Sequence, residues 1–179
     1  MIVEWVPITE TNRIPPFGAE LSDHIASYKN ALKRASCSVW CHLYNTLQSN
    51  GFPIPTVSFS ATGKPCFLDS PICFSLSHTR GLCAVAISDR PVGVDIEIRK
   101  SGYPCHLVER SLCEAEKNVY DGDFTRIWCR KEAVAKMTGE GITGYPAHID
   151  TTGYAFHEEL IDYEGKSYWL AAVEQSIVS

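Results

Sequence analysis

The stretch PVGVDIEIRK, residues 91–100, decides the fold, because it combines the pattern of a β-strand with two carboxylates on one face. Its β-branched side chains recur at every second position, which is the period of a strand: Val92, Val94, Ile96 and Ile98. Gly93, Asp95 and Glu97 fall on the opposite face. The apolar face predicts a strand packed on a core, and the acidic pair on the other face needs a separate explanation.

On both sides of this strand, helical and strand patterns alternate, which predicts an α+β fold. Apolar residues at helical spacing predict one or two helices over residues 20–48 and further helices over 112–120 and 123–138. Asp123 is the candidate N-cap of the last helix, and Gly139 is its candidate C′ residue.

Further strands are predicted by short runs that are apolar or that alternate. They cover residues 2–8, 56–59, 74–78, 82–88, 154–161 and 167–174. No linker of low complexity and no sequence repeat divides the chain. Its 179 residues suffice for one domain, or for two small units that share a core.

The composition is that of a soluble globular protein, with 45% hydrophobic and 21% charged residues. The net charge of −5 and the lack of a Lys/Arg-rich block argue against a nucleic-acid partner. The eight cysteines are scattered without a CxxC pair, so we expect reduced thiols rather than disulfides or a zinc site. The N-terminal MIVEWVPITE does not match a secretory signal and no apolar run is long enough to span a membrane, so we expect a cytoplasmic protein without membrane contact.

Asp95 and Glu97 lie two residues apart on the predicted strand, so both carboxylates are within reach of one hard cation. Mg²⁺ suits such a site, because a few carboxylate oxygens, retained waters and substrate phosphates complete its octahedron. The alternative is that both side chains face solvent on an exposed strand.

A second candidate element is the helical segment WCRKEAVAKMTGEG, residues 128–141. Trp128, Glu132 and Lys136 recur at four-residue intervals and therefore lie on one side of the helix. Glu132 and Lys136 could form an ordinary intrahelical ion pair. The same geometry would let Glu132 supply a third metal ligand while Lys136 reaches a phosphate.

A third candidate element comprises ATGKPCF and FSLSHTRG, residues 61–67 and 74–81. Gly63 permits a turn that presents Lys64, and Ser77 and His78 lie at the end of a predicted strand. A serine hydrolase is disfavoured because strand neighbours point to opposite faces and no GxSxG is present. Contacts to a phosphate or a nucleotide suit these side chains better, although each alone is also compatible with an ordinary surface position.

In their order and joint occurrence, the motifs GKP, FSLSH, VGVDIE and WCRKEAVAK with a following TGEG resemble the 4′-phosphopantetheinyl transferases, specifically the class that activates surfactin synthetase and similar carrier domains. The resemblance covers residues 58–144. It implies Mg²⁺-dependent transfer of the 4′-phosphopantetheine group of coenzyme A to a serine of an acyl or peptidyl carrier protein, with release of adenosine 3′,5′-bisphosphate. The other functions considered are a different Mg²⁺-dependent phosphodiesterase or nucleotidyl transferase and a non-catalytic module that binds coenzyme A or a carrier protein.

The resemblance also implies a fold of two similar α+β halves related by a pseudo-twofold axis. Residues 1–90 would form the N-terminal half with the coenzyme A contacts, and residues 91–179 the C-terminal half with the metal and catalytic residues. The active site would lie between the halves. Because the chain is long enough for both, a monomer is expected.

By the same resemblance, Asp95, Glu97 and Glu132 would hold Mg²⁺, so that two like charges share a strand face because a cation lies between them. Glu132 and Lys136 would act in the catalytic centre, where Lys136 neutralises charge on the leaving phosphate. The family carries a glutamate in a Ser-x-x-Glu pattern at the start of a helix. Glu116 is the best match, with Cys113 in place of the serine, and would take the serine proton. In a register shifted by two residues, Ser111 and Glu114 fit the pattern, so Glu114 is the competing candidate.

Coenzyme A would be contacted by Arg34, Lys64, Ser77, His78 and Lys136. The segment GAELSDHI, residues 18–25, lacks a pair of lysines that the family places there, so the contacts to the 3′-phosphate are not accounted for. The loop of residues 139–146 is expected to form part of the carrier-protein surface.

Overall fold

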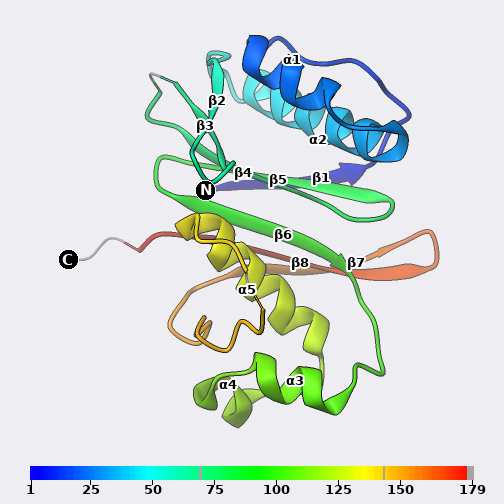
Figure 1. Cartoon of the computed structure of the whole chain (residues 1–179), viewed down its shortest axis with the longest axis vertical. Helices are drawn as coiled ribbons and strands as arrows, with labels where there is room; N and C mark the ends of the chain where they lie inside the picture. Colours follow the sequence, from blue (N-terminus) through cyan, green and yellow to red (C-terminus); the bar gives the residue numbers. More distant parts are fainter. Residues whose placement is uncertain (69, 143, 177–179) are drawn as a thin grey trace.

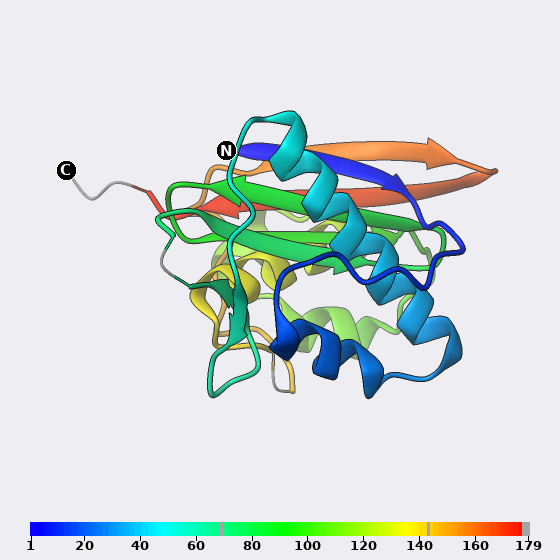
Figure 2. The same ribbon diagram turned by 90° about the horizontal axis from the view of Figure 1, so that it is seen from above.

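Two three-stranded antiparallel sheets lie face to face between two layers of helices (Figures 1 and 2). A computed structural model of the protein describes residues 1–68, 70–142 and 144–176, apart from the side chains of residues 30 and 31. The fold is α+β, as the sequence predicted.

The first sheet has the order β1-β5-β4, and helices cover its outer face. Its strands are β1 (Ile2–Pro7), β4 (Cys73–His78) and β5 (Leu82–Ser88). The helices are α1 (Ala19–Ala26) and α2 (Asn30–Ser49), so the predicted helical region of residues 20–48 is two helices. A small hairpin of β2 (Val57–Phe59) and β3 (Pro65–Phe67) lies beside them, and its turn carries the GKP motif.

The second sheet has the order β6-β8-β7, and α5 packs on its outer face. Its strands are β6 (Val92–Ile98), β7 (His157–Tyr163) and β8 (Lys166–Glu174). The helices of this half are α3 (Cys105–Ser111), α4 (Glu114–Val119) and α5 (Phe124–Thr138). The helix predicted over residues 112–120 is α4, whereas α3 was not predicted; extended backbone at Leu112 and Cys113 separates the two helices.

Both sheets have the same topology, although no sequence repeat reveals it. In each sheet the strands lie in the order first, third, second along the chain, and a long helix connects the first strand to the second. The unit β1-α2-β4-β5 is thus followed by the equivalent unit β6-α5-β7-β8. This repetition agrees with the expected fold of two similar halves.

The core between the sheets comes from alternate positions of strands in both halves. From β5, Leu82, Ala84 and Ala86 face the second sheet, while Cys83, Val85 and Ile87 pack in the core on the side of α2. From β6, the apolar side chains that the sequence placed on one face meet them: Val92, Val94 and Ile96. The strand period predicted for residues 91–100 is therefore confirmed.

The ends of α5 are also as predicted. Asp123 accepts a hydrogen bond from the Arg126 amide at 3.4 Å, and Gly139 adopts a left-handed conformation with φ of 82°. All eight cysteines are free, as the sequence led us to expect. Among the described residues, no helix has both the length and the apolar character needed to cross a bilayer.

Candidate active site

The site begins at Gly93, which lets α5 lie directly on β6. A Cβ atom at this position would lie 1.8 Å from the carbonyl oxygen of Ala133 and 2.7 Å from the amide nitrogen of Met137. A residue without a side chain is therefore needed for this close packing. Gly93, Asp95 and Glu97 share one face of β6, so the contact at Gly93 brings both acidic residues next to α5.

Asp95 is the buried centre of the site, with only 4% of its surface exposed. Its Oδ1 atom accepts hydrogen bonds from Ser77 Oγ and Lys136 Nζ, both at 2.7 Å. Its Oδ2 atom is buried and has no hydrogen-bond partner. Because a buried carboxylate oxygen without a partner is costly, this atom indicates a missing cation or donor.

Glu97 and Glu132 are half-buried and lie close enough to Asp95 to interact with its charge. Burial raises the pKa of Glu97 and of Glu132, and in each case the Asp95 carboxylate raises the pKa further. Lys136 opposes this effect at both residues. Three carboxylates that share a half-buried cleft are therefore short of positive charge.

This carboxylate set fits a divalent cation, since carboxylate oxygens are the ligands that Mg²⁺ prefers. The unpartnered Oδ2 atom of Asp95 is the observation that supports the fit. Asp95, Glu97 and Glu132 do not all approach within 4.8 Å of one another, so binding would require their side chains to move closer.

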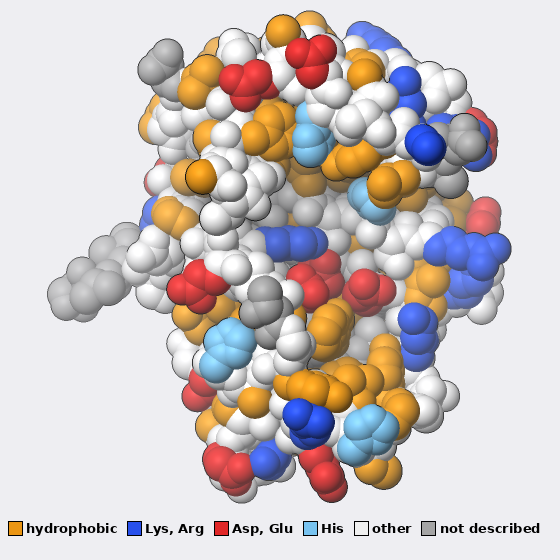
Figure 3. Space-filling model, in the orientation of Figure 1, with side chains coloured by type: hydrophobic (Ala, Val, Ile, Leu, Met, Phe, Trp, Pro, Cys, Tyr) orange, Lys and Arg blue, Asp and Glu red, His pale blue; other side chains and the backbone are white. Residues whose placement is uncertain are grey.

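Basic side chains approach the acidic cluster from both halves. Lys136 on α5 donates to Asp95 and to the Val94 carbonyl, the latter at 3.1 Å. Lys64, from the turn between β2 and β3, donates to the Met137 carbonyl at 2.8 Å. Figure 3 shows a hollow across the middle of this face, with acidic and basic side chains gathered in it.

A cavity of about 280 Å³ connects these groups. Its lining includes Gly63 and Lys64 from the first half and Glu132 and Lys136 from the second half. The structure thus brings together Lys64, Lys136 and the acidic cluster, which lie far apart in the sequence.

His78 lies at the end of β4, near the same cluster. Partial desolvation in the cleft and the positive charge of Lys136 lower its pKa, whereas the Asp95 carboxylate opposes both effects. The imidazole is therefore biased toward its neutral form. Ser77, its neighbour, is only 7% exposed and donates its proton to Asp95, so it does not present a free hydroxyl to the cleft.

Glu116 does not join this cluster, although the sequence analysis made it the general base. It is fully buried, its Oε2 atom lies 2.6 Å from Lys131 Nζ, and it accepts a hydrogen bond from Thr151 Oγ1 at 2.7 Å. It also accepts from the Cys113 amide at 3.0 Å, as the capping box of α4. A carboxylate enclosed and paired in this way cannot reach the hydroxyl of an external protein, so the structure argues for a structural role.

Two other residues that the sequence analysis assigned to the site form their ion pairs with residues outside the acidic cluster. Arg34, in the first turns of α2, pairs with the exposed Glu10 at 3.5 Å. Glu114, the competing candidate for general base, is exposed and pairs with Lys117 at 2.6 Å. Neither contact links these side chains to Asp95.

Sequence reasoning missed two buried residues around the site. Lys131 donates to the carbonyl oxygens of Pro146 and Ile149 in addition to its pairing with Glu116, and thereby anchors the loop after α5. The buried Cys129 donates to the Trp169 carbonyl at 3.3 Å, and burial followed by the charges of Asp95 and Glu97 raises its pKa well above the usual range. The sequence KEA, residues 131–133, indicated Glu132 as a candidate ligand, but nothing in the local sequence indicates that Lys131 is buried.

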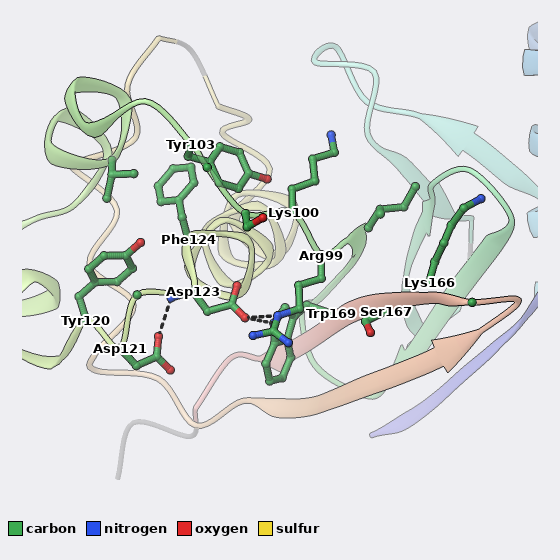
Figure 4. A pocket seen from close by; sticks show the side chains of 16 residues that line it. Arg99, Lys100, Tyr103, Tyr120, Asp121, Asp123, Phe124, Lys166, Ser167 and Trp169 are labelled. Atoms are coloured by element: carbon green, nitrogen blue, oxygen red, sulfur yellow. Dashed lines mark hydrogen bonds and ion pairs between the residues drawn. The ribbon is translucent and has the colours of Figure 1, made fainter.

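A second, larger cavity of about 810 Å³ adjoins the end of β6 (Figure 4). Aromatic side chains gather on one side of it: Tyr103, Tyr120 and Phe124. Arg99 pairs there with Asp123 at 2.7 Å, while Lys100 and Lys166 contribute further positive charge. The cavity therefore has both apolar and basic surface.

Comparison with known proteins shows which family this part of the chain resembles. Residues 91–172 match the family model described as the 4′-phosphopantetheinyl transferase superfamily, and this segment contains Asp95, Glu97, Glu132 and Lys136. Over this segment the chain is similar to the members of that superfamily.

Individual relatives of the chain carry the same description. A 4′-phosphopantetheinyl transferase named AcpT from Salmonella typhimurium is 35% identical over 111 residues, which cover 56% of this chain and 57% of that protein. One named ffp from Bacillus subtilis is 27% identical over 169 residues, which cover 80% and 74%. One named gsp from Aneurinibacillus migulanus is 35% identical over 88 residues, which cover 45% and 36%. The match thus spans little more than half the length of the Salmonella relative.

Proposed function

We propose that the chain transfers the 4′-phosphopantetheine group of coenzyme A to a serine of an acyl or peptidyl carrier protein, with Mg²⁺ as cofactor. The observation that carries this proposal is the buried, unpartnered Oδ2 atom of Asp95. The charges of two further acidic residues, Glu97 and Glu132, interact with Asp95, and Glu132 lines a cavity together with Lys64 and Lys136. A cluster of acids and lysines of this kind suits a pyrophosphate bound together with a metal ion.

Asp95, Glu97 and Glu132 would hold the cation, which when bound draws charge from the pyrophosphate and fixes its orientation. Lys136 and Lys64 would bind the phosphate oxygens, because both line the 280 Å³ cavity and their ammonium groups have three donors each. Lys136 would also neutralise the charge that develops on the leaving phosphate.

Glu132 takes over the role of proton acceptor that the sequence gave to Glu116. Its pKa is raised by burial and by Asp95, which moves the carboxylate closer to the basicity that a general base needs near neutral pH. One of its oxygens can face the cation while the other accepts the serine proton, directly or through a water. His78 remains a candidate contact to the nucleotide phosphates.

The carrier protein would dock over the 810 Å³ cavity, where Lys100 and Lys166 supply positive charge in addition to Arg99, which is paired with Asp123. Local positive charge is needed because this chain is acidic overall and carrier domains are typically acidic too, so that their net charges repel each other. The sequence analysis expected the loop of residues 139–146 to form part of the docking surface. Residue 143 of this loop lies outside the described residues. The Arg110 guanidinium lies over the ring of Tyr145, 4.0 Å from the ring centre. We further propose a monomer, because both halves of the cleft come from one chain.

Incubation of the protein with Mg²⁺, coenzyme A and an apo-carrier domain tests this function. Intact-mass analysis of the carrier should detect the added phosphopantetheine on its serine. Asp95→Asn and Glu132→Gln should each lower the transfer rate by about 100-fold or more, since they act at the proposed metal directly rather than through a supporting group. Asp23→Asn, an exposed acid on α1, is the matched control and should leave the rate unchanged.

Two outcomes would contradict the proposal. Turnover of coenzyme A without any modified carrier would favour a different phosphodiesterase. Transfer at the wild-type rate in Asp95→Asn would remove the metal assignment.

A further inference from the structure

We propose that Ser77 is a positioning residue that aims the Asp95 carboxylate at the metal, although the sequence analysis made it a contact to coenzyme A. The inference deepens the proposed function, since it rests on Asp95 being a metal ligand. It concerns a side chain in the first half that acts on the metal-binding strand of the second half.

The hydroxyl of Ser77 has its bonding fixed by two groups of β6. Its Oγ atom donates to Asp95 Oδ1 at 2.7 Å and accepts from the Ile96 amide at 3.3 Å. A serine hydroxyl has a single proton, and here that proton points at the carboxylate. Because Ser77 is only 7% exposed, water does not readily replace either partner.

These bonds explain which oxygen of Asp95 remains free. Oδ1 receives both donors, Ser77 Oγ and Lys136 Nζ, whereas the buried Oδ2 receives none. With two donors on opposite elements, β4 and α5, the carboxylate plane cannot turn without breaking a hydrogen bond. Ser77 thus helps to occupy Oδ1 and to leave Oδ2 as the oxygen available to a cation.

The Ser77 contact is one of a row of hydroxyl contacts from β4 to the free edge of β6. Ser75 Oγ accepts from the Val94 amide at 3.0 Å, and Thr79 Oγ1 donates to Glu97 Oε2 at 3.4 Å. Ser75 and Ser77 lie on one face of β4, as the strand period requires, and Thr79 follows directly after the strand. Ser75 contacts only the backbone of β6, whereas Ser77 contacts a proposed ligand, so the two serines make a matched pair.

The positioning role and the phosphate-contact role make opposite predictions. A phosphate oxygen without a proton only accepts hydrogen bonds, so contact with Ser77 would require its proton to leave Asp95. Loss of a phosphate contact would raise the KM for coenzyme A and leave metal affinity unchanged. Loss of a positioning group would weaken the metal, as mutation of groups that orient ligands typically does.

The test is a titration of the full chain with Mn²⁺ in the absence of coenzyme A. The electron paramagnetic resonance signal of free Mn²⁺ reports how much of the ion is bound. Ser77→Ala should weaken Mn²⁺ binding by about 10–100-fold, and Ser75→Ala should leave it unchanged. Thermal melting of each variant checks that the protein is folded. In the transfer assay, Ser77→Ala should raise the Mg²⁺ concentration for half-maximal rate more than it raises the KM for coenzyme A.

If Ser77→Ala does not fold, the pair Ser77→Thr and Ser77→Val replaces it, because these side chains have the same shape and differ in the hydroxyl. Ser77→Thr should then bind Mn²⁺ more tightly than Ser77→Val; equal affinities would overturn the inference.

Asp95→Asn separates failure of the inference from failure of the proposed function. If this variant loses Mn²⁺ binding while Ser77→Ala binds like wild type, the role of Ser77 is wrong and the metal site stands. If Asp95→Asn itself binds Mn²⁺ like wild type, the metal site is wrong, and the inference falls with it.

Discussion

At the scale of single residues, Gly93 has more influence on the site than its lack of a side chain suggests. It is the point where β6 and α5 touch, with the Ala133 carbonyl in the space a Cβ atom would need. The separation of the strand and the helix sets the distance between Asp95 and Lys136, now 2.7 Å. The glycine of the VGVDIE motif is therefore explained by packing, and its acidic residues by electrostatics.

Gly93→Ala should lower the free energy of unfolding by about 1–3 kcal/mol or more, the usual cost of overpacking, because the obstacle is backbone and cannot rotate away. The variant should also bind Mn²⁺ more weakly, since α5 is pushed from β6. Urea denaturation measures the first effect. Gly153→Ala is the control, because no atom lies within 4 Å of the added Cβ and the backbone there has no left-handed strain. Equal stability of the two variants would contradict the packing argument.

At the scale of elements, the buried pair of Glu116 and Lys131 joins α4, α5 and the loop that follows α5. Both side chains are fully enclosed, and Thr151 and the carbonyls of Pro146 and Ile149 complete their hydrogen bonds. Burial by itself raises the pKa of Glu116, but hydrogen bonds from Lys131, Thr151 and the Cys113 amide outweigh it and lower the pKa. The pair therefore holds together the elements around α5.

Lys131→Met should destabilise the protein by about 3–5 kcal/mol, because it leaves the Glu116 carboxylate buried without a counter-charge. The double variant Lys131→Met/Glu116→Gln should lose less than the sum of the two single variants, which a denaturation cycle measures. Glu116→Gln should lose stability but, where folded, retain most of the transfer rate. A folded Glu116→Gln without transfer would restore Glu116 as the general base.

The lowered pKa of Glu116 also predicts the sign of a pH effect. A carboxyl group whose pKa is lower in the folded state than in the unfolded state stabilises the fold above its unfolded value, 4.5. That stability is lost as the pH falls below 4.5 toward the folded pKa. The difference in unfolding free energy between wild type and Glu116→Gln should therefore shrink in acid.

At the scale of the whole molecule, the two halves share one core although each has its own sheet. Leu82, Ala84 and Ala86 of the first sheet pack against the apolar face of the second sheet, and the hydroxyls of β4 bond to β6. The cavity lined by Lys64 of the first half and Lys136 of the second half lies where the halves meet. The assignment of coenzyme A contacts to residues 1–90 and of metal ligands to residues 91–179 stays a prediction.

Leu82→Ala, in the core between the sheets, should destabilise both halves together by about 2–5 kcal/mol. Hydrogen exchange followed by mass spectrometry should detect faster exchange in β8 as well as in β1, because neither sheet can open alone without exposing this core. Faster exchange confined to the first sheet would mean that the halves unfold separately.

Much of this protein follows from local patterns along the chain. The strand of residues 91–100, its two faces and both ends of α5 are as predicted, because these features depend on the periodicity and capping of neighbouring residues. The short helix α3 was missed, whereas α4 lies within the helix predicted for residues 112–120. The repeated topology was expected only from the family resemblance and not from any sequence repeat, because similar strand order does not require similar residues.

The sequence by itself determined that Asp95 and Glu97 share a strand face and that Glu132 and Lys136 share a helix side, since both follow from the periods of regular structure. Only the tertiary structure decided that Ser77 donates to Asp95, that Lys64 reaches the end of α5 and that Glu116 is enclosed with Lys131. These contacts join residues 15 to 73 positions apart in the chain. Side chains on separate elements choose their partners by how those elements pack, which no local pattern records.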